Sequence, residues 1–271
     1  MAKIYAEKPL RDYTKVIQYC DEVKADGFDL VDDFSDLFGM NAAGTDAKMR
    51  NTKESILEAQ FTSGAGNWCT WMFGRDLVNW NNNFTWAKWV TPSRDLISAF
   101  KQEGDEVRFK ESIVYYDCNW SNYYPSDNYP FMYKCRSANS SIIKYRYADV
   151  LLLKAEALIM QDTPDLEGAA DIIDEVRDRA KLGALPTSVR SNKNVLLNAL
   201  LKERRLELAF EGQRWFDLVR LDKVEEVMNA VYSKDSGRKA QIYTFDKNSY
   251  RLPIPQSVID ANDKIHQNPG Y

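Results

Sequence analysis

The strongest constraint on the fold is a series of apolar stripes at helical spacing in the second half of the sequence. Apolar residues recur at intervals of three and four in four segments, which cover 147–160, 165–180, 192–212 and 215–231. This period places them on one face of a helix. Asp165, and Asn192 or Asn194, stand where N-cap residues are expected. Helix pairs joined by short links predict a mainly α-helical scaffold that resembles helical-repeat packing, although no strict sequence period is present.

The first part of the sequence has a different character. Residues 10–25 carry one more amphipathic stripe, which the pair Asp26-Gly27 ends. No capping residue or partner helix is near this stripe in the sequence, so we expect its packing partners to lie upstream of the chain. From about 27 to 145, short strand-like pieces such as SILEAQF alternate with long runs rich in Gly, Asn, Ser and Asp. Long loops of this kind usually carry function.

Composition excludes several classes of protein. The chain is 44% hydrophobic and 28% charged, with a net charge of -4 and no long run of like charge, which predicts a folded domain without affinity for nucleic acid. It shows neither a secretory signal at its N-terminus nor an apolar stretch of ~20 residues that could span a membrane. The cysteines lack metal-ligand spacing, and although their even number allows disulfides, we interpret them as buried or incidental thiols. They are Cys20, Cys69, Cys118 and Cys135.

A dense run of charge, KERRLELAFEGQRWFDLVRLDKV, lies in the predicted helical region. Glu203, Glu207 and Glu211 are spaced four apart, and on a helix they would fall on or beside one face. Arg204 lies three residues before Glu207, where carboxylates and guanidinium groups can interlock. One hypothesis makes two of these carboxylates a glycosidase acid and nucleophile. We favour the other, an ion-pair network that locks two helices across Gly212, because exposed charge pairs on helices are common and catalytic pairs rarely share one helix face.

Four segments together resemble the SusD/RagB family. The run ER-x-x-EL-x-x-EG-x-R-x-x-DL-x-R resembles the C-terminal hallmark of that family. RYADVLLLKAEAL at 146–158 and AADIIDEVRDRA at 169–180 look like two of its helices. YRLPIPQSVIDANDKIHQNPGY at 250–271 closely resembles its terminal motif. The four motifs occur in the family's order, and the match is dense from 146 to 271 and looser from 1 to 110.

The resemblance implies a SusD-like fold, which is a mainly α, TPR-like helical scaffold with long aromatic-rich loops and a few short strands. Complete members are longer and begin with a lipoprotein signal and further helical repeats. We therefore expect this chain to correspond to the C-terminal portion, with the N-terminal half missing. Within it we expect a scaffold helix at 1–26, a loop-rich ligand-binding region at 27–145 and a conserved-type helical C-terminal region at 146–271.

The resemblance also implies a function. SusD-like proteins are lipoproteins on the extracellular face of the outer membrane, held there by a lipid anchor that would belong to the missing N-terminal part. They take part in polysaccharide utilisation by capturing oligosaccharides, or for some members peptides, and delivering them to a SusC-like TonB-dependent transporter. The family implies nutrient uptake without catalysis, cofactor or nucleic acid.

Aromatic residues concentrate in two Asn-rich stretches of the predicted loops. A sugar offers an apolar C–H face that aromatic rings cover and hydroxyl groups that Asn, Asp and Arg side chains bind. Most of these rings could instead anchor the loops on the scaffold, but we expect at least one to contact ligand. The candidate ligand-binding residues rest on composition and loop position, not on a family motif, and are Trp68, Trp71, Trp80, Asn81, Trp86, Trp120, Tyr123 and Tyr124.

Little in the sequence supports catalysis. His266 is the single histidine, which argues against a His-based triad or a His-rich metal site. The acidic residues between Asp29 and Asp36 lack the spacing and final Glu of an EF-hand. We therefore predict a binding protein without catalytic residues, metal or cofactor. The alternatives are a glycoside hydrolase with paired carboxylates and an interaction scaffold whose aromatic residues pack internally.

Overall fold

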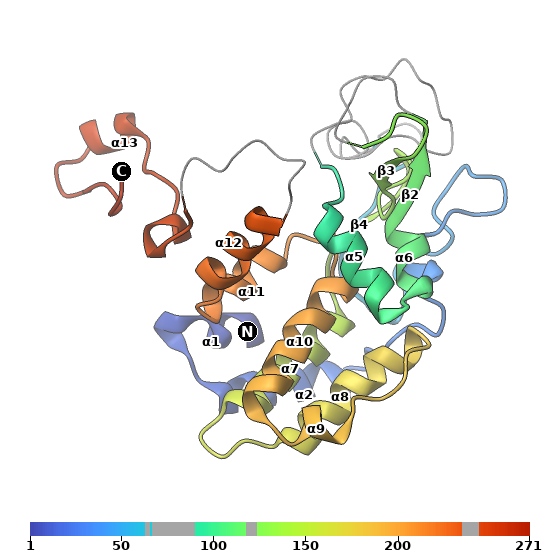
Figure 1. Cartoon of the computed structure of the whole chain (residues 1–271), viewed down its shortest axis with the longest axis horizontal. Helices are drawn as coiled ribbons and strands as arrows, with labels where there is room; N and C mark the ends of the chain where they lie inside the picture. The colour runs from blue at the N-terminus through green and yellow to red at the C-terminus, as the bar shows by residue number, and fades with distance from the viewer. Residues whose placement is uncertain (63–65, 67–89, 118–123, 235–243) are drawn as a thin grey trace. The chain divides into compact units, whose positions relative to one another are not determined.

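Figure 1 shows the computed structural model of the chain. The residues that it describes are 1–62, 66, 90–117, 124–234 and 244–271. They form two compact units, Met1–Arg214 and Trp215–Tyr271. None of the helices in these described ranges is both long and apolar enough to cross a membrane.

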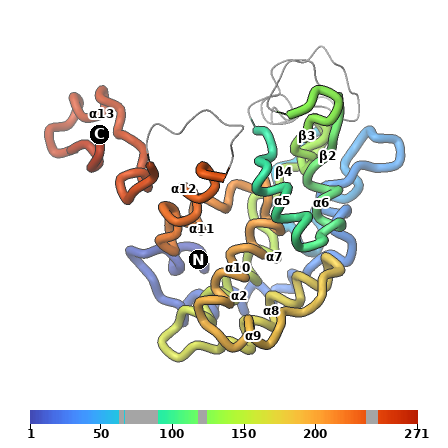
Figure 2. The backbone as a smooth tube through the Cα atoms, in the orientation of Figure 1, coloured from blue at the N-terminus to red at the C-terminus, as the bar shows by residue number. Residues whose placement is uncertain are grey.

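Helix α7 (Tyr147–Met160) lies at the centre of the helices in the first unit. It packs against α2 (Tyr13–Ala25), α8 (Leu166–Arg179) and α10 (Lys193–Glu207). Figures 1 and 2 show these helices side by side. Buried residues surround most of α7, whereas α8 buries one face only, as expected for a helix between partners and a helix at the surface. The neighbouring helices therefore bury their apolar stripes against α7.

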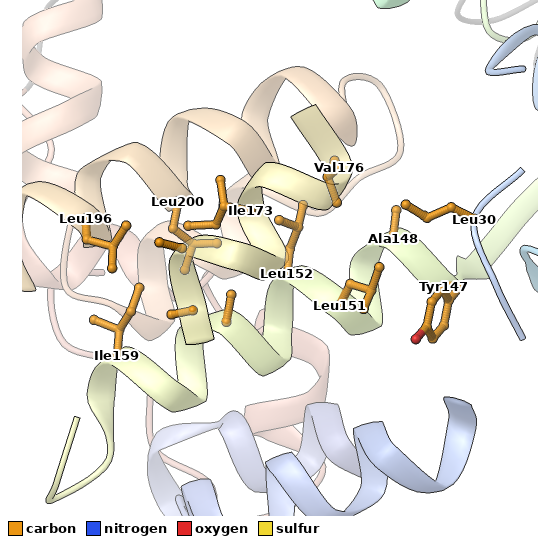
Figure 3. Close-up of a cluster of buried hydrophobic side chains, with 13 residues drawn as sticks. Leu30, Tyr147, Ala148, Leu151, Leu152, Ile159, Ile173, Val176, Leu196 and Leu200 are labelled. Atoms are coloured by element: carbon orange, nitrogen blue, oxygen red, sulfur yellow. The ribbon is translucent and has the colours of Figure 1, made fainter. Parts of the chain in front are cut away.

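Aliphatic side chains fill the space between α7, α8 and α10. Leu152, Ile173 and Leu200, one from each helix, are all fully buried. Figure 3 shows them in one cluster with Leu196 and Ile159. Burial of each such side chain contributes about 1.5–3 kcal/mol, so this cluster is a main source of stability for the first unit.

Side-chain caps begin the long helices. The Asp165 carboxylate accepts a hydrogen bond from the Gly168 backbone amide, and the side-chain oxygen Oδ1 of Asn192 accepts one from the Val195 backbone amide. Both caps stand where the sequence predicts them, and the first two predicted helices of this region, 147–160 and 165–180, are confirmed. Asp12 caps α2 in the same way, so the expectation that this helix lacks a capping residue is wrong.

The expectation that α2 lacks a nearby partner is also wrong. A short helix, α1 (Ala2–Ala6), packs against both α2 and α7. The ring of Tyr5 stacks on that of Tyr19 with centroids 5.7 Å apart. A 3-10 turn, Lys8–Leu10, links the two helices. Five residues are too few to show a helical period, which is why the sequence did not reveal α1.

The described residues of the first unit also form two antiparallel strand pairs. β1 (Ser55–Ala59), which lies in the predicted SILEAQF strand, pairs with β4 (Ile142–Arg146), and register shifts within the pair place Arg146 opposite Ser55. β2 (Ile113–Tyr116) pairs with β3 (Tyr129–Met132). The other helices in the described part of this unit are α3 (Ser35–Phe38), α5 (Arg94–Glu103), α6 (Glu106–Ser112) and α9 (Thr187–Arg190).

Two predicted helices differ from their expected bounds. α10 stops at Glu207 instead of continuing to Gly212, because Phe210 and Gly212 adopt φ angles of +66° and +77°. The predicted helix at 215–231 is two helices, since Asp222, at φ +54°, breaks the run. The elements in the described residues from this point to the C-terminus are α11 (Arg214–Arg220), α12 (Val224–Lys234), the 3-10 helix η2 (Lys247–Tyr250) and α13 (Gln256–Asp260).

Leu152→Ala tests the role of the central cluster. We expect the substitution to lower the free energy of unfolding by about 2–5 kcal/mol, because it leaves a cavity between three helices. Val195→Ala is the matched control, since Val195 lies on α10 with 42% of its surface exposed and should change stability by less than about 1 kcal/mol. Urea denaturation followed by circular dichroism measures the stability of both variants. Equal losses of unfolding free energy would contradict the role of the central cluster as a main source of stability.

Candidate functional site

Most of the candidate ligand-binding residues lie outside the described part of the chain. These are Trp68, Trp71, Trp80, Asn81, Trp86, Trp120 and Tyr123. Their role as ligand contacts stays a prediction. Tyr124 is described, and it is half-buried.

Tyr124 packs against the hairpin of β2 and β3. Its ring meets the Tyr129 ring edge to face, with centroids 5.6 Å apart, and its hydroxyl donates to the Pro92 carbonyl at 2.7 Å. The guanidinium of Arg94 lies 4.9 Å from the Tyr124 ring centroid. Thr91 and Tyr129 share a hydrogen bond of 2.7 Å between their hydroxyl groups. These contacts tie the start of α5 to the hairpin, so Tyr124 has at least an anchoring role.

A cavity of about 430 Å³ lies in the first unit, within the size range of small-molecule sites. Its walls come from β3, β4 and the turn after α10. Val90, which directly follows the 67–89 stretch that holds five of the seven tryptophans, forms part of the lining. The described residues that line it are Phe38, Val90, Met132, Lys134, Cys135, Ser141, Ile142, Ile143, Lys144, Phe210, Glu211 and Gly212.

The turn after α10 shapes one wall of this cavity. Phe210 and Gly212 both have left-handed backbone conformations, which glycine adopts freely and phenylalanine rarely does. The turn brings Phe210 to the cavity while Glu211 points back into the buried region. A strained residue of this kind often marks a functional position.

Lys134 and Glu211 form a buried ion pair at the cavity. The Lys134 ammonium donates to Glu211 Oε1 at 2.6 Å and to the Glu207 carbonyl at 2.8 Å. Burial lowers the pKa of Lys134 to about 8 and outweighs the attraction of Glu211. Burial alone would raise the pKa of Glu211, but Arg146 and Lys134 hold that pKa below its ordinary value. Both groups are therefore charged at neutral pH.

Glu207 is the centre of the ion-pair network beneath the cavity. Its carboxylate is fully buried and accepts hydrogen bonds from Arg108 at 3.0 Å, Arg146 at 2.5 Å and Arg179. These three cations keep the pKa of Glu207 well below its ordinary value against the opposing effect of burial. Arg108 belongs to α6, Arg146 to β4 and Arg179 to α8, so one carboxylate joins three elements to α10.

Two further carboxylates extend the network. Glu54, just before β1, accepts from Arg146 at 2.7 Å and from Arg179 at 2.8 Å. Glu203 accepts from Arg108 at 2.5 Å, yet burial raises the pKa of Glu203 above its ordinary value. The segments joined in this way lie far apart in the sequence.

The charged run has a structural role, but the network differs from the predicted lock between two helices across Gly212, because Glu207 joins α10 to α6, β4 and α8. The sequence interpretation paired Arg204 with glutamates on its own helix and took the charges to be exposed. Arg204 instead bonds Asp149 of α7 at 2.7 Å, and Glu203 and Glu207 are buried. Their partners come from other elements, which a spacing rule within one helix does not detect.

The same geometry disfavours the glycosidase hypothesis for these three glutamates. Glu203 and Glu207 are not among the residues that line the cavity, and both Glu211 oxygens accept hydrogen bonds from Arg146. A glycosidase needs two carboxylates that face the substrate. Among the described residues, no group of His, Cys, Asp and Glu side chains could hold a metal ion.

Sequence reasoning missed the cavity residues Lys134, Lys144 and Phe210. Lys134 follows the apolar strand YPFM with one residue between, where a buried lysine is unusual. That placement was the one available signal, and it does not identify a cavity.

Comparison with known proteins matches residues 126–271 to the SusD family. Two relatives from Formosa agariphila are similar in sequence. SusD-like protein P38 is 43% identical over 99 residues, which are 34% of this chain and 19% of the relative. SusD-like protein P2 is 36% identical over 143 residues, which are 50% of this chain and 27% of the relative.

Solved structures share the fold. A SusD homolog from Bacteroides thetaiotaomicron matches 100% of this chain and 62% of its own length, with a TM-score of 0.72 and 22% identity. Surface glycan-binding protein A from the same organism, in complex with laminarihexaose, matches 94% of this chain and 59% of its own length, with a TM-score of 0.68 and 20% identity. The mainly α fold with few short strands is therefore confirmed, and the chain spans less than two thirds of these proteins.

Glu207→Ala tests the network. We expect a loss of about 3 kcal/mol or more in the free energy of unfolding, because three buried guanidinium groups lose their common counter-charge. Glu175→Ala, at an exposed position of α8, should change stability by less than about 0.5 kcal/mol. Urea denaturation compares the two, and a loss below about 1 kcal/mol for Glu207→Ala would show that the network is not essential.

Asp149→Asn tests the pH dependence of a second buried ion pair. Asp149 accepts from Lys3 and Arg204, each at 2.7 Å, and these cations outweigh burial and lower the pKa of Asp149 from 3.8 to about 2. Because folding lowers this pKa, the ionised Asp149 carboxylate stabilises the folded state above pH 4. This stabilisation is lost as the pH falls toward 2 and the carboxylate is protonated.

The difference in unfolding free energy between wild type and Asp149→Asn should therefore shrink by about 2 kcal/mol between pH 5 and pH 2. Urea titrations at a series of pH values measure it. Asp32→Asn, at a side chain that is 98% exposed, should show no such change. A difference that is constant with pH would refute the role of the Asp149 charge.

Proposed function

Because the chain belongs to the SusD family, we propose that it binds oligosaccharides without transforming them. The observation that carries the proposal is the cavity of about 430 Å³, whose lining combines the rings of Phe38 and Phe210 with the polar groups of Lys134 and Ser141. Aromatic and aliphatic walls suit the C–H face of a sugar, and a few polar groups orient its hydroxyls.

The adjoining loops support the same proposal. Val90 lines the cavity and directly follows the Trp- and Asn-rich stretch at 67–89. We infer that the ligand site extends over the 27–145 region and uses rings such as Trp80 and Trp120. The structural neighbour solved with laminarihexaose supports a glycan rather than another ligand class.

The wider role follows from the family. We propose that the complete protein acts at the outer face of the outer membrane, where a lipid anchor holds it. There it delivers captured oligosaccharides to a SusC-like TonB-dependent transporter. Capture and release need no covalent bond to form or break. This fits the cavity, because its carboxylate Glu211 is engaged in ion pairs with Arg146 and Lys134.

Fluorescence titration tests the proposal, since the chain contains seven tryptophans. A panel of oligosaccharides that includes laminarihexaose should give saturable quenching with at least one member and no release of reducing ends. Trp80→Ala or Trp120→Ala should weaken that binding by about tenfold, as expected for loss of one stacking ring. Trp215→Ala, at the start of the second unit, is the matched control. Absence of a saturable response to every glycan would overturn the proposal.

A further inference from the structure

The described lining of the cavity carries more cationic than anionic side chains. The charged side chains among its described lining residues are Lys134, Lys144 and Glu211. Glu211 is already compensated, because Arg146 binds both of its oxygens, at 2.7 and 2.8 Å, and Lys134 binds one of them. Lys134 is paired with Glu211, so the positive charge of Lys144 is not neutralised by any carboxylate among the described lining residues.

Lys134 has one N–H donor without a hydrogen-bond acceptor among the described residues. An ammonium group has three N–H donors, and two of those of Lys134 bind the Glu207 carbonyl and the Glu211 carboxylate. No described residue accepts a hydrogen bond from the third. The Lys134 side chain is only 4% exposed, and the ring of Phe38 lies 4.7 Å from its nitrogen. In such surroundings a charged donor favours an anionic acceptor over a neutral one.

Lys144 supplies a second cation on the same cavity. It lies on β4, it is exposed, and it forms no ion pair with any residue in the described part of the chain. Its charge is therefore available to a ligand. Lys134 lies two residues after the end of β3 and Lys144 lies on β4, and both residues line the cavity.

The remaining walls fit the body of a sugar ring. Phe210 and Phe38 contribute aromatic surface, and Met132 and Ile142 contribute aliphatic surface. A ligand that matches all of these features has an apolar face and one negatively charged group.

Resting on the proposed glycan-binding function, we propose that this cavity receives a sugar unit that carries an oxyanion, such as the carboxylate of a uronic acid, and that Lys134 and Lys144 bind this oxyanion. The protein would then select acidic over neutral oligosaccharides of the same linkage.

Matched ligand pairs test the selectivity. Isothermal titration calorimetry compares β-1,4-glucohexaose with the β-1,4-glucuronic acid hexamer, and β-1,4-mannohexaose with the β-1,4-mannuronic acid hexamer. We expect at least one acidic hexamer to bind about tenfold or more tightly than its neutral partner. The preference should shrink between about 50 and 500 mM NaCl, because salt screens the exposed Lys144.

Two substitutions locate the selectivity. Lys144→Gln removes the charge at an exposed position and keeps a polar side chain, and it should weaken binding of the acidic hexamer by about fivefold while the neutral partner changes less than about twofold. Lys134→Met, checked for folding by circular dichroism, should have the larger effect of about tenfold or more. Lys110→Gln, at an exposed lysine of α6 outside the cavity, is the control and should change neither affinity.

The outcomes separate this inference from the proposed function. A neutral oligosaccharide that binds as tightly as its acidic partner, or tighter, overturns the inference and leaves the proposed function standing. An acidic preference that Lys144→Gln and a folded Lys134→Met both retain also overturns it. Free glucuronic acid that binds as tightly as the hexamer shows a small-carboxylate site instead. Absence of binding by every hexamer and by the earlier panel overturns both proposals.

Discussion

Glu207 places a negative charge where solvent does not reach, and arginines from α6, β4 and α8 neutralise it. A buried charge is tolerated only when its partners are close and well oriented. The four elements that supply these groups therefore have to meet at one point. Apolar packing against α7 holds the helices together, but it is weakly directional, whereas guanidinium–carboxylate bonds require particular positions and angles. We infer that the network selects one arrangement of elements among those that the apolar core would allow.

The same network supports the cavity. Arg146 bonds Glu207 and Glu211 together, so the turn after α10 is held against β4. This turn carries Phe210 to the cavity wall, and Lys134 reaches from the end of β3 to the Glu207 carbonyl. Two of the charged groups at the candidate site, Lys134 and Glu211, are thus fixed by bonds to each other and to neighbouring groups. The ionisation of Glu211 is also set there, because Arg146 binds both of its oxygens and Lys134 binds one of them.

Local sequence signals predicted the helices well wherever the apolar period was long and the cap was clear. α7 and α8 have the expected bounds, and Asp165 and Asn192 cap as predicted. The signals failed where the backbone turns through a left-handed residue that is not glycine, as at Phe210 and Asp222. An amino-acid pattern carries little information about such positions, because tertiary contacts impose them. The five-residue helix α1 was missed because it is shorter than two helical turns.

The sequence by itself determined the family, the helical scaffold and the presence of a conspicuous charged run, because periodicity, caps and motif order are local properties. Only the tertiary structure decided what that run does. Glu203, Glu207 and Glu211 look like neighbours on one exposed helix face, yet their partners are arginines and a lysine up to 99 residues away. The cavity arises in the same way, from residues of β3, β4 and the turn after α10 that share no sequence pattern. The physical reason is that buried charges and cavities depend on which distant segments meet, whereas helices depend on residues three and four positions apart.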